Sequence, residues 1–192
     1  NKLFGELPFR TNYDVSHGKV LNEIDYLPVT KPNLQPLNQL LLELKISHKQ
    51  FQQVLYAVLM SLTKKKKVYI SLPGNVSEAA HGAYQLAHYL FQCIPYELRK
   101  VFSFLSYHAE PISKKNIGLM FVEKGSIRSQ DSSINRDFVF DFDQSFFLNS
   151  NEEANQQPFI QFAIEMVQEH SRDLDHFYAY AETNLLDMPN PS

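Results

Sequence analysis

The stretch Val68-Tyr-Ile-Ser-Leu72, followed by Pro73-Gly74-Asn75, decides the fold of this chain. Its first five residues include β-branched and aromatic side chains, which is typical of a strand, and the proline and glycine then end that strand in a turn. Ser77 is expected to cap the helix that follows, with Glu78 in its first turn. Apolar side chains then recur at helical spacing as far as Phe91. The segment therefore predicts a strand, a turn and a helix in direct succession.

Three further strands are predicted downstream, at 102–107, 117–122 and 138–142. In the last one, Phe138, Phe140 and Phe142 share one face, and Asp141 and Asp143 are expected on a face that meets water. A strand, a crossover helix and a second strand favour a right-handed βαβ unit, and hence a sheet with a parallel portion. We therefore predict an α/β fold with a mixed sheet of about four strands, covered by helices.

The remaining helices are predicted from apolar side chains at helical spacing. They start at Leu37, at Ser47 and after Pro95, and a long one runs over 159–183 with a break near Ser171. Ser47 and Gln50 match a capping box. Residues 1–36 show neither a helical nor a strand period, so we expect an irregular N-terminal appendage or part of a preceding domain, with the α/β domain at 37–192.

The composition describes an ordinary soluble chain. It has 192 residues, 44% apolar residues, a formal net charge of -3 and one cysteine. No apolar run is long enough to span a bilayer, and the lone Cys93 indicates either a reducing compartment or indifference to redox state, so a cytoplasmic location is expected. The acidic balance weighs against nucleic acid as a partner. Because the chain starts at Asn1 without a methionine, it is expected to be a piece of a longer protein.

The turn after the first strand is the candidate ligand-binding edge. In open α/β sheets, ligands gather outside the carboxyl ends of parallel strands, and here that places Ser71 and Pro73, Gly74 and Asn75 at the edge, with Ser77 beside them. Free N–H groups at the start of the next helix favour an anion. The turn lacks both common glycine-rich phosphate motifs, so a helix-capping turn is the favoured interpretation.

The run Lys64, Lys65, Lys66 and Lys67 is a candidate interaction surface. Four cations in a turn can meet the phosphates of nucleic acid or of lipid headgroups. The flanking residues lack the aromatic and arginine side chains of a strand-binding groove. A solvated turn between a helix and a strand is therefore the favoured interpretation.

No catalytic residue, metal site or cofactor is predicted. The chain contains no G-x-S-x-G motif, and Cys93 lies in an apolar setting without an activating neighbour. Glu169, Asp173 and His176 share a helical face, but no partner motif appears elsewhere. A non-enzyme is therefore favoured over an enzyme.

One part of the sequence resembles a known family. Residues 53–60, the strand at 68–72 and the segment 94–107 together resemble the bacterial GTPase-associated protein family, with the most specific positions at Leu98, Arg99, Ser103, Phe104 and Tyr107. The resemblance implies a non-catalytic scaffold or adaptor in a large, multidomain, cytoplasmic protein associated with a GTPase or another NTP-driven complex. A fainter likeness is to the central part of DENN-type domains. Arg99 is expected to cap the carboxyl end of its own short helix or to reach the carboxylate or phosphate of a partner.

These observations favour a protein-interaction module whose partner is another protein, such as a GTPase, or another domain of its own chain. The alternative is a nucleotide- or phosphate-binding enzyme domain that uses the turn at 73–77, with Lys67 or His81. A third hypothesis is a membrane- or nucleic-acid-surface binder that uses the lysine run.

Overall fold

The computed structural model describes residues 34–64, 66–169 and 171–185. Most of the predicted N-terminal appendage, 1–36, lies outside these residues, so the division into appendage and domain stays a prediction. All the elements named below belong to the unit Gln35–Ser192. None of the helices in the described ranges is both long and apolar enough to cross a membrane.

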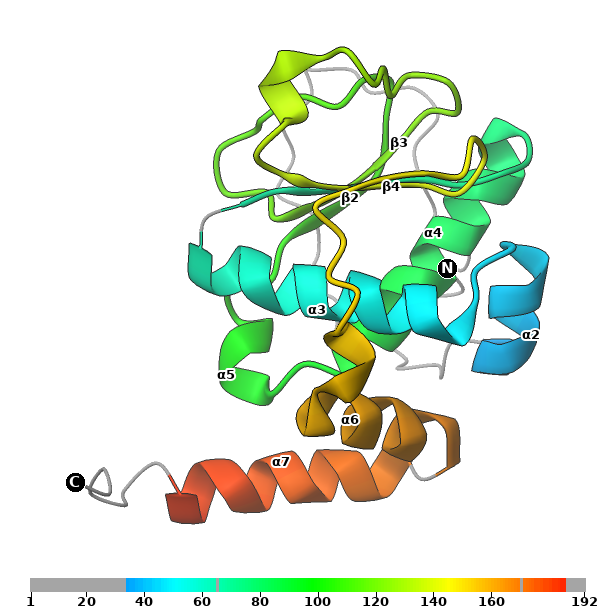
Figure 1. Cartoon of the computed structure of the whole chain (residues 1–192). Coiled ribbons are helices and arrows are strands. Elements are labelled where there is room, and N and C mark those ends of the chain that lie inside the picture. The colour runs from blue at the N-terminus through cyan, green and yellow to red at the C-terminus, as the bar shows by residue number, and fades with distance from the viewer. Residues whose placement is uncertain (1–33, 65, 170, 186–192) are drawn as a thin grey trace, which may run out of the picture. The chain divides into compact units, whose positions relative to one another are not determined.

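A five-stranded mixed sheet forms the centre of the described unit (Figure 1). Its strands are β1 (Val68–Ser71), β2 (Phe104–His108), β3 (Leu119–Val122), β4 (Phe138–Asp141) and β5 (Phe146–Leu148). Their order across the sheet is β2-β3-β1-β4-β5. The first four strands are parallel, and β5 returns antiparallel to β4. The predicted α/β class with a mixed sheet is confirmed, and β5 is an addition that the sequence did not suggest.

Six α-helices accompany the sheet within the described residues. They are α2 (Leu37–Glu43), α3 (His48–Lys64), α4 (Val76–Gln92), α5 (Tyr96–Arg99), α6 (Pro158–Glu169) and α7 (Ser171–Leu185). Helices α4 and α5 connect β1 to β2, which lie on either side of β3 and form the predicted βαβ unit. The predicted long helix with a break near Ser171 corresponds to α6 and α7.

The helix starts are fixed by side chains that satisfy free backbone groups. At α3, the N–H of Gln50 donates to Ser47 Oγ and the N–H of Ser47 donates to Gln50 Oε1, so the predicted capping box is confirmed. At α4, the N-cap is Asn75, which pairs reciprocally with Glu78. The expectation that Ser77 caps this helix is therefore wrong, because the helix already begins at Val76.

The sheet separates two apolar clusters. The larger cluster includes Ile70 and Phe140 on the side that α3 and α4 cover (Figure 1). The smaller one joins Tyr69 and Val139 to Ile134 of the segment 123–137, which crosses the other face between β3 and β4. Because alternate residues of each strand point to opposite faces, both faces of the central strands are buried.

Asp141 contradicts the expectation of a strand with a wet face. Asp141 is only 1% exposed, and all four residues of β4 are buried. Two turn N–H groups, those of Asp143 and Gln144, donate to Asp141 Oδ1 at 3.1 and 3.0 Å. The carboxylate is therefore buried because it closes the turn between β4 and β5, a role that alternation of polar and apolar residues does not reveal.

Candidate functional site

The carboxyl ends of β1 and β3 form a topological switch point. From β1 the chain passes to α4 on the helix-covered face, whereas from β3 it passes to segment 123–137 on the opposite face. Since β1 and β3 are parallel neighbours, their outgoing connections diverge at this edge. In α/β sheets, small ligands bind at such a point. The predicted residues Pro73, Gly74, Asn75 and Ser77 follow β1 here.

The turn at 73–77 is built as a helix cap. Gly74 has φ +102°, a conformation that suits glycine. The N–H of Asn75 donates to Glu78 Oε2 at 2.9 Å, and the N–H of Glu78 donates to Asn75 Oδ1 at 3.0 Å. A carboxylate therefore lies at the positive end of α4, where an incoming phosphate would meet charge repulsion. This geometry supports the interpretation as a capping turn.

A cavity of about 460 Å³ lies beside the turn, between α2 and α4. Pro73, Gly74 and His81 line it, whereas Asn75 and Ser77 do not. Glu43, Lys45 and Glu78 also line it, so an entering group meets two carboxylates and one ammonium group. The two carboxylates, one of them at the start of α4, weigh against a phosphate in this cavity.

Two buried polar side chains meet at this edge: Ser71, which the sequence placed here, and Asp141, which the sequence placed on a face that meets water. Ser71 ends β1 and is 0% exposed, and Asp141 ends β4 at the paired register position. Neither Ser71 Oγ nor Asp141 Oδ2 has a hydrogen-bond partner among the described residues. Such atoms are rare in folded proteins. Each is a polar residue at the end of an apolar strand, but the sequence gives no sign that the two lie side by side.

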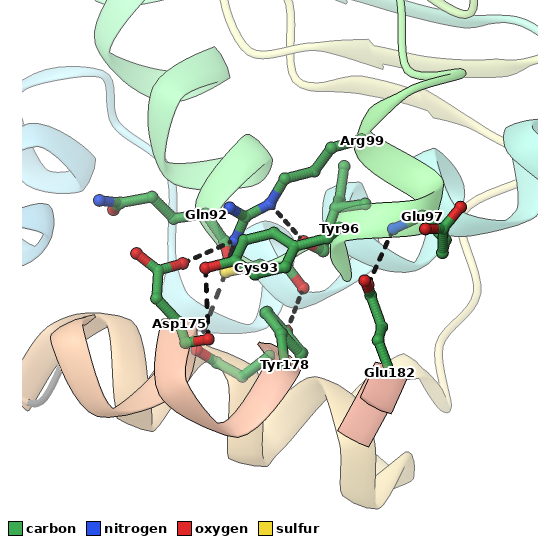
Figure 2. A network of polar contacts seen from close by, with 10 residues as sticks. Gln92, Cys93, Tyr96, Glu97, Arg99, Asp175, Tyr178 and Glu182 are labelled. Carbon is green, nitrogen blue, oxygen red and sulfur yellow. Dashed lines mark hydrogen bonds and ion pairs between the residues drawn. The ribbon is translucent and has the colours of Figure 1, made fainter. Parts of the chain in front are cut away.

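Arg99 lies at the centre of a network that joins α4, α5 and α7 (Figure 2). Its Nε donates to the carbonyl of Ile94 at 2.6 Å, and its Nη2 donates to the carbonyl of Gln92 at 2.9 Å. Nη2 also pairs with Asp175 Oδ1 at 3.1 Å. Arg99 thus caps the carboxyl end of α4, not that of its own short helix α5. Its side chain is 14% exposed, so most of its binding capacity is used inside the molecule.

Aromatic rings enclose the same guanidinium. The Arg99 Cζ atom lies 4.5 Å from the ring centre of Tyr96, 5.2 Å from that of Phe91 and 5.6 Å from that of Tyr178. The Tyr178 hydroxyl donates to the carbonyl of Cys93 at 2.7 Å (Figure 2). Burial raises the pKa of the Cys93 thiol to about 12, with the charge of Arg99 acting in the opposite direction. The network therefore contains an inert thiol and a shielded cation, which is typical of a structural centre.

The lysine run does not form one continuous patch in the described residues. Lys67 Nζ donates to the carbonyls of Lys114 and Ile117 at 2.8 and 2.6 Å. Lys66 Nζ lies 5.1 Å from the ring centre of Phe138. Lys64 is exposed, and Lys65 lies outside the described residues. Two of the four cations therefore have contacts within the domain, and a role for the run in binding stays a prediction.

The edge strand β2 is the most exposed part of the sheet. β2 has one neighbour in the sheet, β3. Phe104 and Tyr107 are 39% and 42% exposed, and Val101, just before the strand, is 62% exposed. The ring of Phe102 stacks on that of Phe104 and makes a tilted contact with that of Phe91, which links α4 to this strand. Three of the positions that carry the family resemblance, Ser103, Phe104 and Tyr107, therefore lie in or next to the exposed edge.

Comparison with known proteins finds a similarity to a protein family. A family model described as GTPase-associated protein 1, middle domain, matches residues 40–144. The matched range contains α3, α4 and the first four strands, and it ends before β5, α6 and α7. No curated protein matches the chain. No solved structure matches it.

Proposed function

The chain belongs to the GTPase-associated protein 1 family, as its sequence resemblance predicted, and from that premise we propose that it is a protein-binding module. The module is a non-catalytic scaffold domain of a larger cytoplasmic bacterial protein, and its partner is a GTPase. The family description supports the association with a GTPase. The exposed edge strand β2 supports a role in binding protein.

The single observation that carries the proposal is the exposure of apolar side chains on an edge strand. An edge strand presents unpaired N–H and C=O groups, and proteins commonly protect such edges with charges, prolines or covering segments. β2, with the sequence Phe104-Leu-Ser-Tyr-His108, contains no lysine, acidic residue or proline. Its exposed backbone and aromatic side chains fit an extended segment of the partner that adds a strand beside β2.

The Arg99 network supports this role by fixing the approach to β2. Arg99 holds the end of α4 and the start of the segment that leads into the strand. Phe102, which lies between Arg99 and β2 in the sequence, packs against the rings of Phe91 and Phe104. A binding edge that is already ordered loses less conformational entropy when a partner binds.

The alternative, a nucleotide- or phosphate-binding enzyme domain at the turn 73–77, has less support. The Glu78 carboxylate is hydrogen-bonded to the backbone at the start of α4, where the phosphate would bind. Among the described residues, no group of three or more His, Cys, Asp and Glu side chains is arranged to hold a metal ion.

The proposal is tested with the full-length protein that contains this chain and a panel of purified GTPases from the same organism. Each GTPase is loaded with GDP or with a non-hydrolysable GTP analogue, and binding is measured by biolayer interferometry. We expect one GTPase to bind and the Phe104→Lys and Tyr107→Lys variants to weaken that binding at least about tenfold, because a buried lysine at a protein interface is costly.

Leu42→Lys is the matched control, since Leu42 is 79% exposed on α2 and does not belong to β2. It is expected to leave binding unchanged. If no GTPase binds in either nucleotide state, the association with a GTPase is wrong. If a GTPase binds and both β2 variants bind equally well, the module is retained but the β2 surface is wrong.

A further inference from the structure

Two buried oxygen atoms at the carboxyl edge of the sheet have no hydrogen-bond partner among the described residues. They are Ser71 Oγ and Asp141 Oδ2, in residues that are 0% and 1% exposed. An unsatisfied buried polar atom costs about 1–3 kcal/mol, and more where the group is charged. Neither atom is the partner of the other, because no hydrogen bond joins them.

The fold places these two side chains next to each other. Ser71 and Asp141 are paired in the parallel register of β1 and β4. Their sequence neighbours Ile70 and Phe140 belong to the helix-side cluster, and Tyr69 and Val139 belong to the cluster on the other face. By alternation along each strand, Ser71 and Asp141 both point to that second face, beneath segment 123–137.

The position of each oxygen is fixed by neighbouring contacts. Asp141 Oδ1 accepts the N–H groups of Asp143 and Gln144, which leaves Oδ2 as the free oxygen. The N–H of Phe142 donates to the carbonyl of Ser71 at 3.0 Å, which ties the ends of the two strands together. The two free oxygens are therefore held on a rigid frame.

The electrostatic surroundings favour a neutral ligand over a metal ion. Lys124 Nζ lies 2.8 Å from Asp143 Oδ1, two residues after Asp141. The Lys124 contact lowers the pKa of the Asp143 carboxyl, with a smaller contribution from Lys45. Because the Asp143 carboxylate is already paired with Lys124, it is not free to act as a second metal ligand beside Asp141. The described residues also provide no set of three or more acidic, histidine or cysteine side chains for a metal.

We propose that a single water molecule is bound between Ser71 Oγ and Asp141 Oδ2. The water donates one hydrogen to the carboxylate oxygen and accepts the hydrogen of the serine hydroxyl, so both orphan atoms are satisfied. It joins the ends of β1 and β4 at the edge where the Pro73-Gly74 turn begins. This site is independent of the proposed partner, because its ligand is solvent and its location is buried.

A crystal structure of the full chain at a resolution near 1.5 Å tests the proposal directly. The expected result is density for one water within hydrogen-bond distance, roughly 2.7–3.2 Å, of both oxygens. A direct bond between the two side chains, or an empty space, would overturn it. Density at roughly 2.0–2.6 Å from the oxygens, with stabilisation by Mg²⁺ or Ca²⁺ that Asp141→Asn removes, would assign a metal instead.

Unfolding of the Ser71→Ala, Asp141→Asn and double variants in urea provides a second test. If one water bridges the two residues, the unfolding constant of the double variant should differ from the product of the single effects by about tenfold, or roughly 1.4 kcal/mol. Ser61→Ala is the control, because the buried Ser61 hydroxyl donates to the carbonyl of Val58 and not to this site. It should combine additively with Asp141→Asn.

Additivity of Ser71→Ala with Asp141→Asn would overturn the bridge. If Asp141→Asn does not fold, the crystal structure of Ser71→Ala decides, since the water should then lose its fixed position. An unchanged, fully occupied water in that variant would show that Ser71 does not bind it.

Discussion

Arg99 and Asp175, which are 76 residues apart in sequence, are joined by a contact of 3.1 Å between Nη2 and Oδ1. Arg99 lies in the range that matches the family model, whereas Asp175 belongs to α7, which lies beyond it. Tyr96 adds a second link, because its hydroxyl donates to the carbonyl of Asp175 at 3.2 Å. The Arg99 network therefore attaches a helix from outside the matched range to the α/β core.

Replacing Arg99 should destabilise the domain. The Arg99→Ala change removes the ion pair and leaves the carbonyls of Gln92 and Ile94 without their donor, so we expect a loss of about 2–3 kcal/mol in the free energy of unfolding. Urea denaturation followed by circular dichroism measures it. Lys100→Ala is the control, because its pair with Glu97 is exposed to solvent and should contribute little to stability. Equal effects of the two variants would contradict a structural role for the network.

Cys93 should be unreactive in the native state. The thiol is buried and its pKa is raised to about 12, so only about one molecule in ten thousand carries the thiolate at pH 8. Labelling with a disulfide reagent is expected to be at least about a thousandfold slower than in urea, where the thiol is free. As Cys93 is the only cysteine of the chain, the signal is unambiguous. Rapid labelling of the native protein would contradict the buried position.

Stability should fall as the pH rises above about 9. Burial raises the pKa of Tyr69 to about 12 from 10.0 and that of Cys93 to about 12 from 9.0, and it also raises the pKa of Tyr178. Between the unfolded and folded values, the unfolded chain has lost protons that the native state keeps, so the native state becomes less stable. Each group contributes at most about 1.4 kcal/mol per pH unit in that window.

Urea midpoints measured from pH 8 to pH 11 check this dependence. Tyr69→Phe should flatten the decline above pH 10, whereas Tyr180→Phe, which alters a side chain that is 65% exposed, should not. A decline that is identical in the two variants would argue against burial of the Tyr69 hydroxyl as its cause.

The sequence predicted the elements whose signals are local. The strand β1 and the helix α4 were predicted, apart from the N-cap residue, because β-branched residues, a proline-glycine turn and helical periodicity act over a few positions. β5 was missed because it has only three residues, directly after Ser145 with φ +53°. Neither feature produces a periodic pattern.

The chemistry of the candidate sites depends on contacts that are distant in sequence. Asp141 looked like a solvent-facing residue, because alternation cannot show that segment 123–137 covers that face. The pairing of Arg99 with Asp175 links residues separated by several elements, and no short motif encodes it. Ser71 and Asp141 lie side by side because β1 and β4 are neighbours in the sheet, and the sequence does not reveal that strand order. Residue types could therefore be named in advance, but their partners could not.

Gly74 and Gly125, the glycines with positive φ among the described residues, offer a matched test of the turn that opens α4. At Gly74, with φ +102°, an added Cβ would lie 2.8 Å from Glu78 Oε2, the atom that accepts the N–H of Asn75. At Gly125, with φ +75°, an added Cβ would have no atom within 4 Å. Both alanine variants suffer backbone strain of about 1–2 kcal/mol, but only Gly74→Ala also disturbs a helix cap worth about 1 kcal/mol. We therefore expect Gly74→Ala to lower the free energy of unfolding by about 1 kcal/mol more than Gly125→Ala, as measured by urea denaturation. Equal losses would mean that Glu78 moves aside without cost, and that the reciprocal contacts of Asn75 and Glu78 do not stabilise the start of α4.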